Sequence, residues 1–238
     1  MSVYLASRKR PFGRSAQGCR GERMIEHKRA KNHKDVGVFY NTKYKNAGYD
    51  AFSNKDRRVY TDLLERFGGA FKDGQQFLDA GCGHGEFLAC LPGFVRKYGI
   101  DASEEAIELA RMRFKGQDAT LVCGDLEVSN EVFGNEPVFD YISTLGVLEH
   151  TMDPKKAFSC LLALLKPGGS LLVLVPLVFD DCLGQLRREE NQVTNERFAF
   201  ATEWIDFFGT AHLVYYEVLG NEGSKDIALI YTKKGESI

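Results

Sequence analysis

Acidic residues and glycines occur together in residues 77–88, which read Phe-Leu-Asp-Ala-Gly-Cys-Gly-His-Gly-Glu-Phe-Leu. Apolar residues lead to Asp79, and Gly81 and Gly83 begin a series of alternating glycines that runs into a helix-forming stretch. A strand that ends in a glycine-rich turn before a helix lets backbone N–H groups approach a polar ligand closely. The stretch therefore predicts a loop that binds a polar cofactor.

The spacing of the glycines separates this loop from two other cofactor loops. A P-loop requires Gly-x-x-x-x-Gly-Lys-Ser/Thr, and the chain contains no such run. A dinucleotide-binding loop requires Gly-x-Gly-x-x-Gly, whereas here the third glycine comes one residue early, at Gly85. Asp79 and Glu86 would also place negative charge where a pyrophosphate has to lie. Acidic groups at this position favour a cationic ligand, such as one with an ammonium or a sulfonium group.

An acidic residue followed by Gly-x-Gly-x-Gly resembles the first motif of the class I S-adenosylmethionine (SAM)-dependent methyltransferases. For this motif alone, a glycine-rich turn of another nucleotide-binding α/β domain is the alternative. Two later motifs, Val-Leu-Glu-His-x-x-Asp-Pro from Val147 and Leu-Lys-Pro-Gly-Gly-x-Leu from Leu165, are more specific. Both resemble the small-molecule methyltransferase group that includes the quinone-biosynthesis methyltransferases. The three motifs cover residues 77–176 in the order and spacing of that family.

The hydrophobic pattern predicts an α/β fold in which strands alternate with helices. The expected strands of the parallel part are residues 75–80, 94–100, 119–123, 138–143 and 170–175, and the expected final hairpin is 211–219 with 226–232. The resemblance implies a Rossmann-like, seven-stranded, mostly parallel sheet in the order 3-2-1-4-5-7-6, with helices on both faces.

Two acids stand at the expected carboxyl ends of successive strands. Asp101 is placed to accept hydrogen bonds from both ribose hydroxyls, as in other nucleoside-binding sheets, although an acid that only precedes a helix is the alternative. The resemblance implies that Asp125 accepts the amino group of adenine and that Leu126 donates its backbone N–H to the ring. A polar turn is the alternative for this second pair.

The resemblance implies SAM as the cofactor and S-adenosylhomocysteine as its product. The residues expected to bind the cofactor are Asp79, Gly81, Cys82, Gly83, Asp101, Ala102, Asp125, Leu126, Leu145 and Tyr40. No metal is expected, because cysteines, histidines and carboxylates do not cluster at metal-ligand spacing in the sequence.

The first 34 residues differ in composition from the rest of the chain. They carry ten Lys or Arg and two Glu, a net charge of +8, while the whole chain carries −2. We expect residues 1–34 to form a basic, disordered arm and residues 35–238 to form a single domain. The arm either docks on RNA or another anionic surface, or is a solvated tail, in which case Met24 could be the true start.

The resemblance implies that residues 36–68 form an N-terminal lid over the cofactor. Aromatic faces attract cations, so Tyr40, Tyr44 and Tyr49 could close on the sulfonium of the cofactor. A helix that packs its aromatic residues on the core is the alternative.

Composition indicates an ordinary soluble protein of 238 residues, with 44% hydrophobic and 27% charged residues. No apolar run reaches about 18 residues, so no membrane-spanning helix is expected. The six cysteines form no Cys-x-x-Cys pair, which favours buried thiols and a cytoplasmic location. The acidic remainder of the chain makes nucleic acid an unexpected partner, and the sequence leaves the oligomeric state open.

These observations predict an enzyme that transfers a methyl group from SAM to a small-molecule acceptor, at oxygen, by in-line displacement. His150 is the candidate acid/base residue, since it follows the fourth strand and titrates in a suitable range; a structural role is the alternative. An RNA or protein methyltransferase that docks through the arm is a second hypothesis. The place after the fourth strand holds 143–146, Ser-Thr-Leu-Gly, and not an Asn/Asp-Pro-Pro-Tyr/Phe motif for an amino acceptor. A SAM-binding protein without catalysis is the third.

Overall fold

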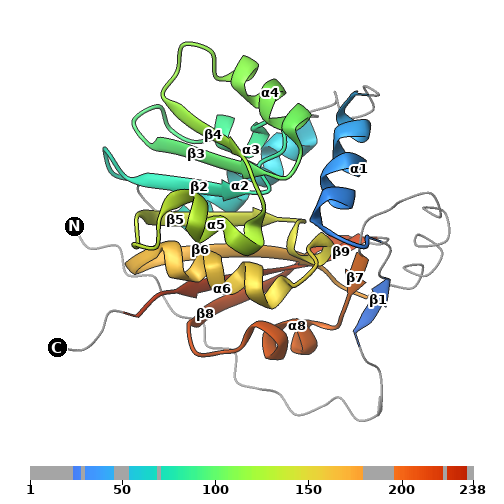
Figure 1. Cartoon of the computed structure of the whole chain (residues 1–238). Coiled ribbons are helices and arrows are strands. Elements are labelled where there is room, and N and C mark those ends of the chain that lie inside the picture. Colours follow the sequence, from blue (N-terminus) through green and yellow to red (C-terminus); the bar gives the residue numbers. More distant parts are fainter. Residues whose placement is uncertain are drawn as a thin grey trace, which may run out of the picture.

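The computed structural model of the chain describes residues 24–27, 30–45, 54–68, 71–178, 196–221 and 224–234. A central sheet lies between helices in the described part of the chain (Figure 1).

The sheet contains seven strands in the order β4-β3-β2-β5-β6-β9-β8. Its strands are β2 Gln76–Ala80, β3 Arg96–Asp101, β4 Ala119–Cys123, β5 Phe139–Leu145, β6 Leu165–Pro176, β8 Leu213–Asn221 and β9 Ser224–Thr232. The first five are parallel, and β9 is antiparallel to both β6 and β8. Numbered within this sheet, the order is 3-2-1-4-5-7-6, which confirms the expected topology.

The fifth strand of the sheet begins earlier than the sequence predicts. It starts at Leu165 instead of residue 170, because Leu165 already pairs with Phe139. The next pair joins Tyr141 to Ser170, so the register shifts between the two pairs. The Lys-Pro-Gly-Gly segment lies within this irregularity and does not end the strand.

A separate two-stranded pair joins the N-terminal part of the chain to a segment near residue 197. Strand β1, Ile25–His27, runs antiparallel to β7, Glu196–Phe198. Ala30, between β1 and the first helix, is buried. The last part of the expected basic arm therefore contains β1 and the first two residues of α1, which begins at His33. The rest of that expectation falls on residues 1–23, 28 and 29, which lie outside the described residues.

The helices alternate with the parallel strands, as the hydrophobic pattern predicts. They are α1 His33–Lys45, α2 Asn54–Gly68, α3 Glu86–Ala89, α4 Glu104–Arg113, α5 Ser129–Phe133, α6 Pro154–Leu164 and α8 Ala201–Phe208, with 3₁₀ turns η1 Leu126–Val128 and η2 Leu148–His150. Ser103 caps α4 by accepting from the Ala106 N–H at 3.1 Å, and Asp153 caps α6 by accepting from the Lys156 N–H at 3.0 Å. Ser and Asp are both residue types that favour the N-cap position, so these helix starts agree with the local sequence.

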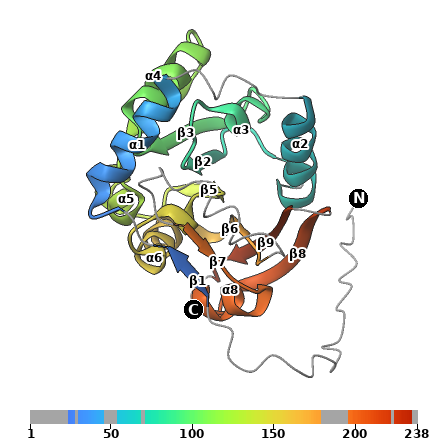
Figure 2. The same ribbon diagram turned by 90° about the vertical axis from the view of Figure 1, so that its right-hand side faces the viewer.

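Alternation along the strands divides the core between the two faces of the sheet. In β6, Leu171 and Val173 pack with α6 and α8, whereas Leu172 packs with α2, α3 and α4. Figure 2 shows α2 on the opposite side of the sheet from α6 and α8. Because helices cover both faces of the sheet, a ligand can reach residues of the strands only at the strand ends.

Helix α8 packs against the core and bonds to the last residue of β6. Trp204 is fully buried, stacks on Phe208 with 5.5 Å between ring centroids, and donates its indole N–H to the Pro176 carbonyl oxygen at 2.7 Å. Pro176 lines the cavity described below. The only tryptophan of the chain therefore supports the rim of that cavity from behind.

Replacing Trp204 with Ala should lower the free energy of unfolding by about 3–5 kcal/mol, because a large buried ring is lost and a cavity remains. Urea denaturation of the variant beside wild type measures this change. Val214→Ala is the control, since Val214 is 60% exposed, and it should cost less than about 0.5 kcal/mol. Equal losses in the two variants would contradict the packing role of Trp204.

Candidate active site

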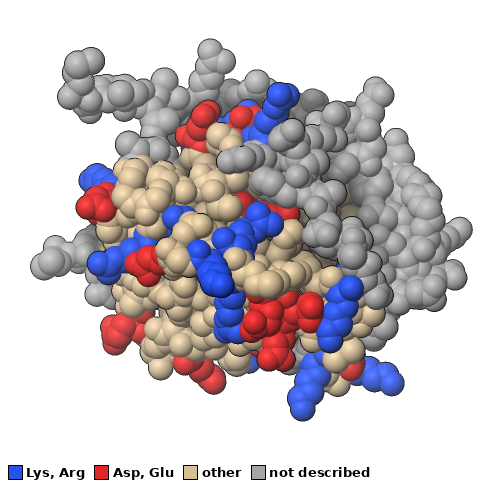
Figure 3. Space-filling view, turned by 90° about the horizontal axis from the view of Figure 1, so that it is seen from above, with Lys and Arg blue, Asp and Glu red and all other residues tan. Residues whose placement is uncertain are grey.

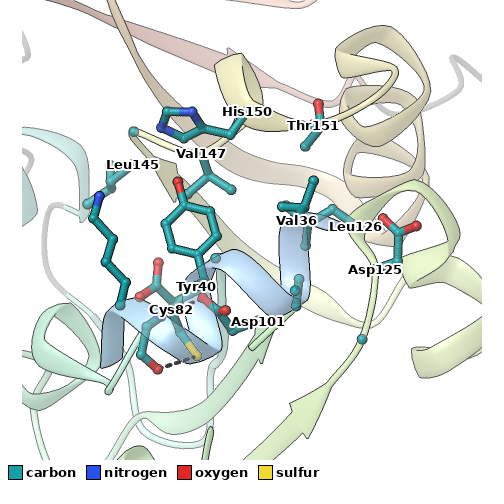
Figure 4. Close-up of a pocket in the computed structure, with 18 of the residues that line it drawn as sticks. Val36, Tyr40, Cys82, Asp101, Asp125, Leu126, Leu145, Val147, His150 and Thr151 are labelled. Atoms are coloured by element: carbon teal, nitrogen blue, oxygen red, sulfur yellow. Dashed lines mark hydrogen bonds between the residues drawn. The ribbon is translucent and has the colours of Figure 1, made fainter. Parts of the chain in front are cut away.

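A cavity of about 840 Å³ opens at the carboxyl ends of the parallel strands, under helix α1. Figure 4 shows part of its lining. The ten residues expected to bind the cofactor and the candidate acid/base residue all line it: Asp79, Gly81, Cys82, Gly83, Asp101, Ala102, Asp125, Leu126, Leu145, Tyr40 and His150. The structure thus brings these residues together, and their individual roles stay predictions.

The glycine loop between β2 and α3 requires its glycines. Gly81 has φ +84°, and a Cβ built on it would lie 2.3 Å from a methyl carbon of Val147. Gly83 has φ +51°, and a Cβ there would lie 2.5 Å from the Tyr44 hydroxyl. The N–H groups of Gly81 and Cys82 donate to the Ile100 carbonyl at 2.7 and 3.0 Å, which fastens the loop to β3. Any side chain at these positions would open the turn.

Asp101 connects the glycine loop to the loop that follows β3. Its Oδ2 accepts from the Gly83 N–H at 2.9 Å and its Oδ1 from the Ser103 N–H at 2.8 Å. An ionised carboxylate has about four acceptor positions, so two remain for ligand hydroxyls. Burial raises the pKa of Asp101, and the two N–H bonds oppose this rise. The carboxylate is therefore held in a fixed orientation with acceptor capacity left for a ligand.

Asp79 is a second acid in the cavity, and it is only 3% exposed. It accepts from the Ser143 hydroxyl at 2.7 Å. Its pKa is raised to about 7: burial is the main cause, the bond from Ser143 opposes the rise, and the negative charge of Asp101 adds to it. A cationic group bound beside Asp79 would favour its ionised form. The charge of this end of the cavity thus fits a cationic ligand.

Asp125 and Leu126 lie at the end of β4, where the expected adenine corner should be. Asp125 Oδ1 accepts from the Glu127 N–H at 3.0 Å and thereby caps the η1 turn. Glu127 in turn accepts from the Asp153 N–H at 2.8 Å, which joins this corner to the start of α6. The sequence analysis missed Glu127, which is buried and sets the position of the corner.

Helix α1 covers one side of the cavity with an aromatic face. The ring of Tyr40 lies 6.0 Å from that of His150, and its hydroxyl end points toward His150 (Figure 4). The ring of Tyr44 lies 5.7 Å from that of His84 in the glycine loop. Tyr49, the third expected lid residue, lies outside the described residues. The arrangement supports the lid interpretation, because both described rings face the cavity.

His150 is held in place by a residue that the sequence analysis missed. Arg197 in β7 is 2% exposed, and it donates to the carbonyl oxygens of Glu149 at 2.9 Å, Thr151 at 2.6 Å and Met152 at 3.1 Å. These carbonyls flank His150 on both sides, so the guanidinium fixes the turn that carries the imidazole. The only feature of the sequence that could have pointed to Arg197 is its place directly before the apolar residues 198–201.

The described residues were expected to contain neither a metal site nor a membrane-spanning helix. Among them no group of three or more His, Cys, Asp or Glu side chains could hold a metal ion. None of the described helices is long and apolar enough to cross a membrane.

A model of the methyltransferase domain family matches residues 52–214, which is more than half of the chain. The chain therefore belongs to this family, and the resemblance to class I SAM-dependent methyltransferases is confirmed. S-adenosylmethionine is the cofactor that this membership implies. The cavity fits it, because its volume lies in the range of small-molecule sites, roughly 300–1,000 Å³, and its buried acids suit a cationic ligand.

A ubiquinone biosynthesis O-methyltransferase of Alkalilimnicola ehrlichii is 34% identical over 104 residues, or 42% of this chain. The chain spans about two fifths of the length of such curated relatives.

Among solved structures, the N-methyltransferase NodS of Bradyrhizobium japonicum with bound S-adenosylhomocysteine has a TM-score of 0.62 at 20% identity, over 81% of this chain and 97% of that chain. The [4+2]-cyclase SpnF has a TM-score of 0.67 at 16% identity, over 87% of this chain and 99% of that chain. At this identity both show the fold alone.

Replacing Asp79 with Asn should remove part of the pH dependence of stability. Since the folded-state pKa of about 7 lies above the ordinary value of about 4, the folded state binds a proton more tightly than the unfolded state. The free energy of unfolding of wild type should therefore fall as pH rises from about 4 to 7. Asn cannot ionise, so the variant should gain stability relative to wild type across this window and hold that gain at higher pH.

Urea denaturation without added ligand, between about pH 5 and pH 8, measures the difference between the two proteins. Asp73→Asn is the matched control, because Asp73 is exposed and outside the cavity. A difference between Asp79→Asn and wild type that stays constant across the window would contradict the raised pKa.

Proposed function

We propose that this protein transfers a methyl group from SAM to a hydroxyl oxygen of a small-molecule acceptor, with S-adenosylhomocysteine as the second product. One observation carries the proposal: a single cavity is lined by the glycine loop, by Asp101 and Asp125 at the ends of successive parallel strands, and by the Tyr40–His150 pair. The acids provide cofactor recognition, and the pair stands where an acceptor can approach.

Each end of the cavity has a distinct binding task. Asp101 accepts the ribose hydroxyls with the acceptor positions that its two N–H bonds leave. Asp125 accepts the adenine amino group, and Leu126 donates its N–H to the ring. Asp79 and the glycine loop bind the amino-acid portion. The cofactor supplies an electrophilic methyl group on a sulfonium, and the protein aligns the acceptor with it and excludes water.

His150 accepts the proton of the acceptor hydroxyl. Its imidazole follows the end of β5, beside the Tyr40 ring, and Arg197 holds the turn on both sides of it. A carboxylate oxygen of Glu149 lies 3.8 Å from Nε2. A neutral histidine can take up a proton near neutral pH, which suits a general base.

An acceptor with an apolar body suits the surroundings of His150, because Met152, Pro176 and Phe198 line the cavity on its side. Oxygen as the methyl acceptor is supported by the name of the Alkalilimnicola ehrlichii relative, an O-methyltransferase. The N-methyltransferase among the structural neighbours makes nitrogen the alternative that the assay must include.

The described surface favours a small-molecule acceptor over a nucleic acid. On the face seen in Figure 3, basic and acidic side chains of the described residues lie interspersed. Nucleic-acid binding draws much of its affinity from clustered Lys and Arg side chains that neutralise phosphates. Docking of RNA would thus depend on the N-terminal arm, whose residues 1–23 lie outside the described part. A cytoplasmic location, expected from the cysteine pattern, stays a prediction.

Asp101→Ala should weaken SAM binding about 10- to 100-fold, because hydrogen bonds to a charged group are lost. Calorimetry with SAM and S-adenosylhomocysteine, with NADH as a negative control, measures the affinity. Asp73→Ala is the matched control, because Asp73 is exposed and does not line the cavity. An absence of SAM binding by wild type, or a preference for NADH, would contradict the proposed cofactor.

His150→Ala should lower the rate of methyl transfer about 100-fold while SAM binding is retained, because only proton transfer is lost. The assay follows labelled methyl from SAM into a panel of phenols, alcohols and primary amines. His212→Ala serves as the control, since His212 lies outside the cavity. Near-normal transfer by His150→Ala would contradict the base role, and transfer to amines alone would contradict oxygen as the acceptor.

A further inference from the structure

Helix α1 contains a glycine in its interior that helix propensity alone does not explain. Gly37 follows the first turn of α1, where glycine costs up to about 1 kcal/mol relative to Ala. A Cβ built on Gly37 would lie 2.8 Å from the carbonyl oxygen of Ala102, in the loop that follows β3. The glycine therefore allows the helix backbone to approach the loop beside Asp101.

One turn later, Asn41 bonds the same loop through its side chain. Asn41 Oδ1 accepts from the Ser103 hydroxyl at 2.8 Å and from the Glu105 N–H at 3.1 Å. The Ser103 hydroxyl oxygen itself accepts from the Ala106 N–H at 3.1 Å. Asn41 thus completes the N-terminal cap of α4 with a side chain from a different helix.

These contacts continue the hydrogen bonds of the cofactor site. The Ser103 N–H donates to Asp101, and Asp101 also accepts from Gly83 of the glycine loop. A connected series therefore runs from the glycine loop through Asp101 and Ser103 to Asn41. Helix α1 is attached at the residue that we assign to the ribose.

The same helix covers the cavity. Gly37, Asn41, Tyr40 and Tyr44 all line it, and Tyr44 reaches the glycine loop on its other side. A cofactor bound beside Asp101 and the glycine loop, beneath α1, cannot leave on the side of α1 unless the helix moves away from the loop after β3.

From these observations we infer that Asn41, with the close approach at Gly37, is the latch that holds α1 closed over the cofactor and sets how long the cofactor stays bound. Asn41 is a positioning residue in this role. The inference rests on the proposed function for the identity of the cofactor. It adds the residue that controls access to the site.

The test measures association and dissociation of tritiated SAM with the full chain, the latter by a chase with excess unlabelled SAM. In Asn41→Ala the dissociation rate should rise about tenfold, because two hydrogen bonds of the closed state are lost. The association rate should rise as well, because the cavity is open more of the time. The loss of a direct cofactor contact would raise only the dissociation rate. Ala forms helix better than Asn, so the change does not act by weakening α1.

A second variant opens the latch in a different way, and two controls should leave it closed. Gly37→Ala should also raise both rates, because its Cβ displaces α1 from Ala102, although Ala favours the helix. Asn41→Asp keeps the acceptor oxygen at the α4 N-terminus, where negative charge is favourable, and should behave like wild type. Lys45→Met removes an exposed contact with Glu105 between the same two helices, 3.8 Å long, and should change neither rate.

Hydrogen exchange of residues 33–45 without SAM gives a readout that does not depend on the cofactor. Exchange should be faster in Asn41→Ala and Gly37→Ala than in wild type, Asn41→Asp and Lys45→Met. Unchanged SAM rates and unchanged exchange in Asn41→Ala would overturn the latch. A rise in the dissociation rate alone, with unchanged exchange, would overturn it in favour of a direct contact. If wild type did not bind SAM at all, the result would contradict the proposed cofactor, and with it the role of Asn41 in retaining that cofactor.

Discussion

The carboxylate of Asp101 is the interaction on which the rest of the site depends. It accepts one backbone N–H from the glycine loop and one from the loop after β3, so it holds two neighbouring turns of the sheet in one arrangement. This is possible because β2 and β3 are adjacent and parallel, which brings their carboxyl ends together. The carboxylate is largely enclosed, so burial disfavours its ionised form, and the N–H bonds offset that cost.

Three segments that are distant in the sequence converge on this centre. Helix α1 reaches the loop after β3 through Asn41, strand β7 reaches the turn of His150 through Arg197, and α8 supports the end of β6 through Trp204. The pair β1–β7 links the first two segments, because β1 leads into α1. The loop after β3 and the turn of His150, on two sides of the cavity, are therefore connected through the N-terminal part of the chain.

The fold alone leaves the reaction open, as its neighbours include an N-methyltransferase and a cyclase. The chain's own groups indicate more: buried acids favour a cation, an imidazole is fixed at the edge of the cavity, and an apolar lining lies beside it. These groups agree with membership of the methyltransferase domain family and with SAM as the cofactor.

The sequence by itself determined the elements and residues whose signals are local. Spacing and residue type reveal features that stand within a few residues of the turn they form. These are Asp79 with the glycines after it, the acids at the carboxyl ends of β3 and β4, and the caps at Ser103 and Asp153. The strand order followed from the motifs through a family resemblance. Only the tertiary structure showed that Asn41 completes the cap of a helix 62 residues away and that Arg197 holds the carbonyl of Glu149, 48 residues away. Contacts over such separations leave no periodic pattern in the sequence, because they depend on how finished elements pack. The early start of β6 and the pair β1–β7 also left no local pattern, because each depends on pairing with a strand that is distant in the sequence.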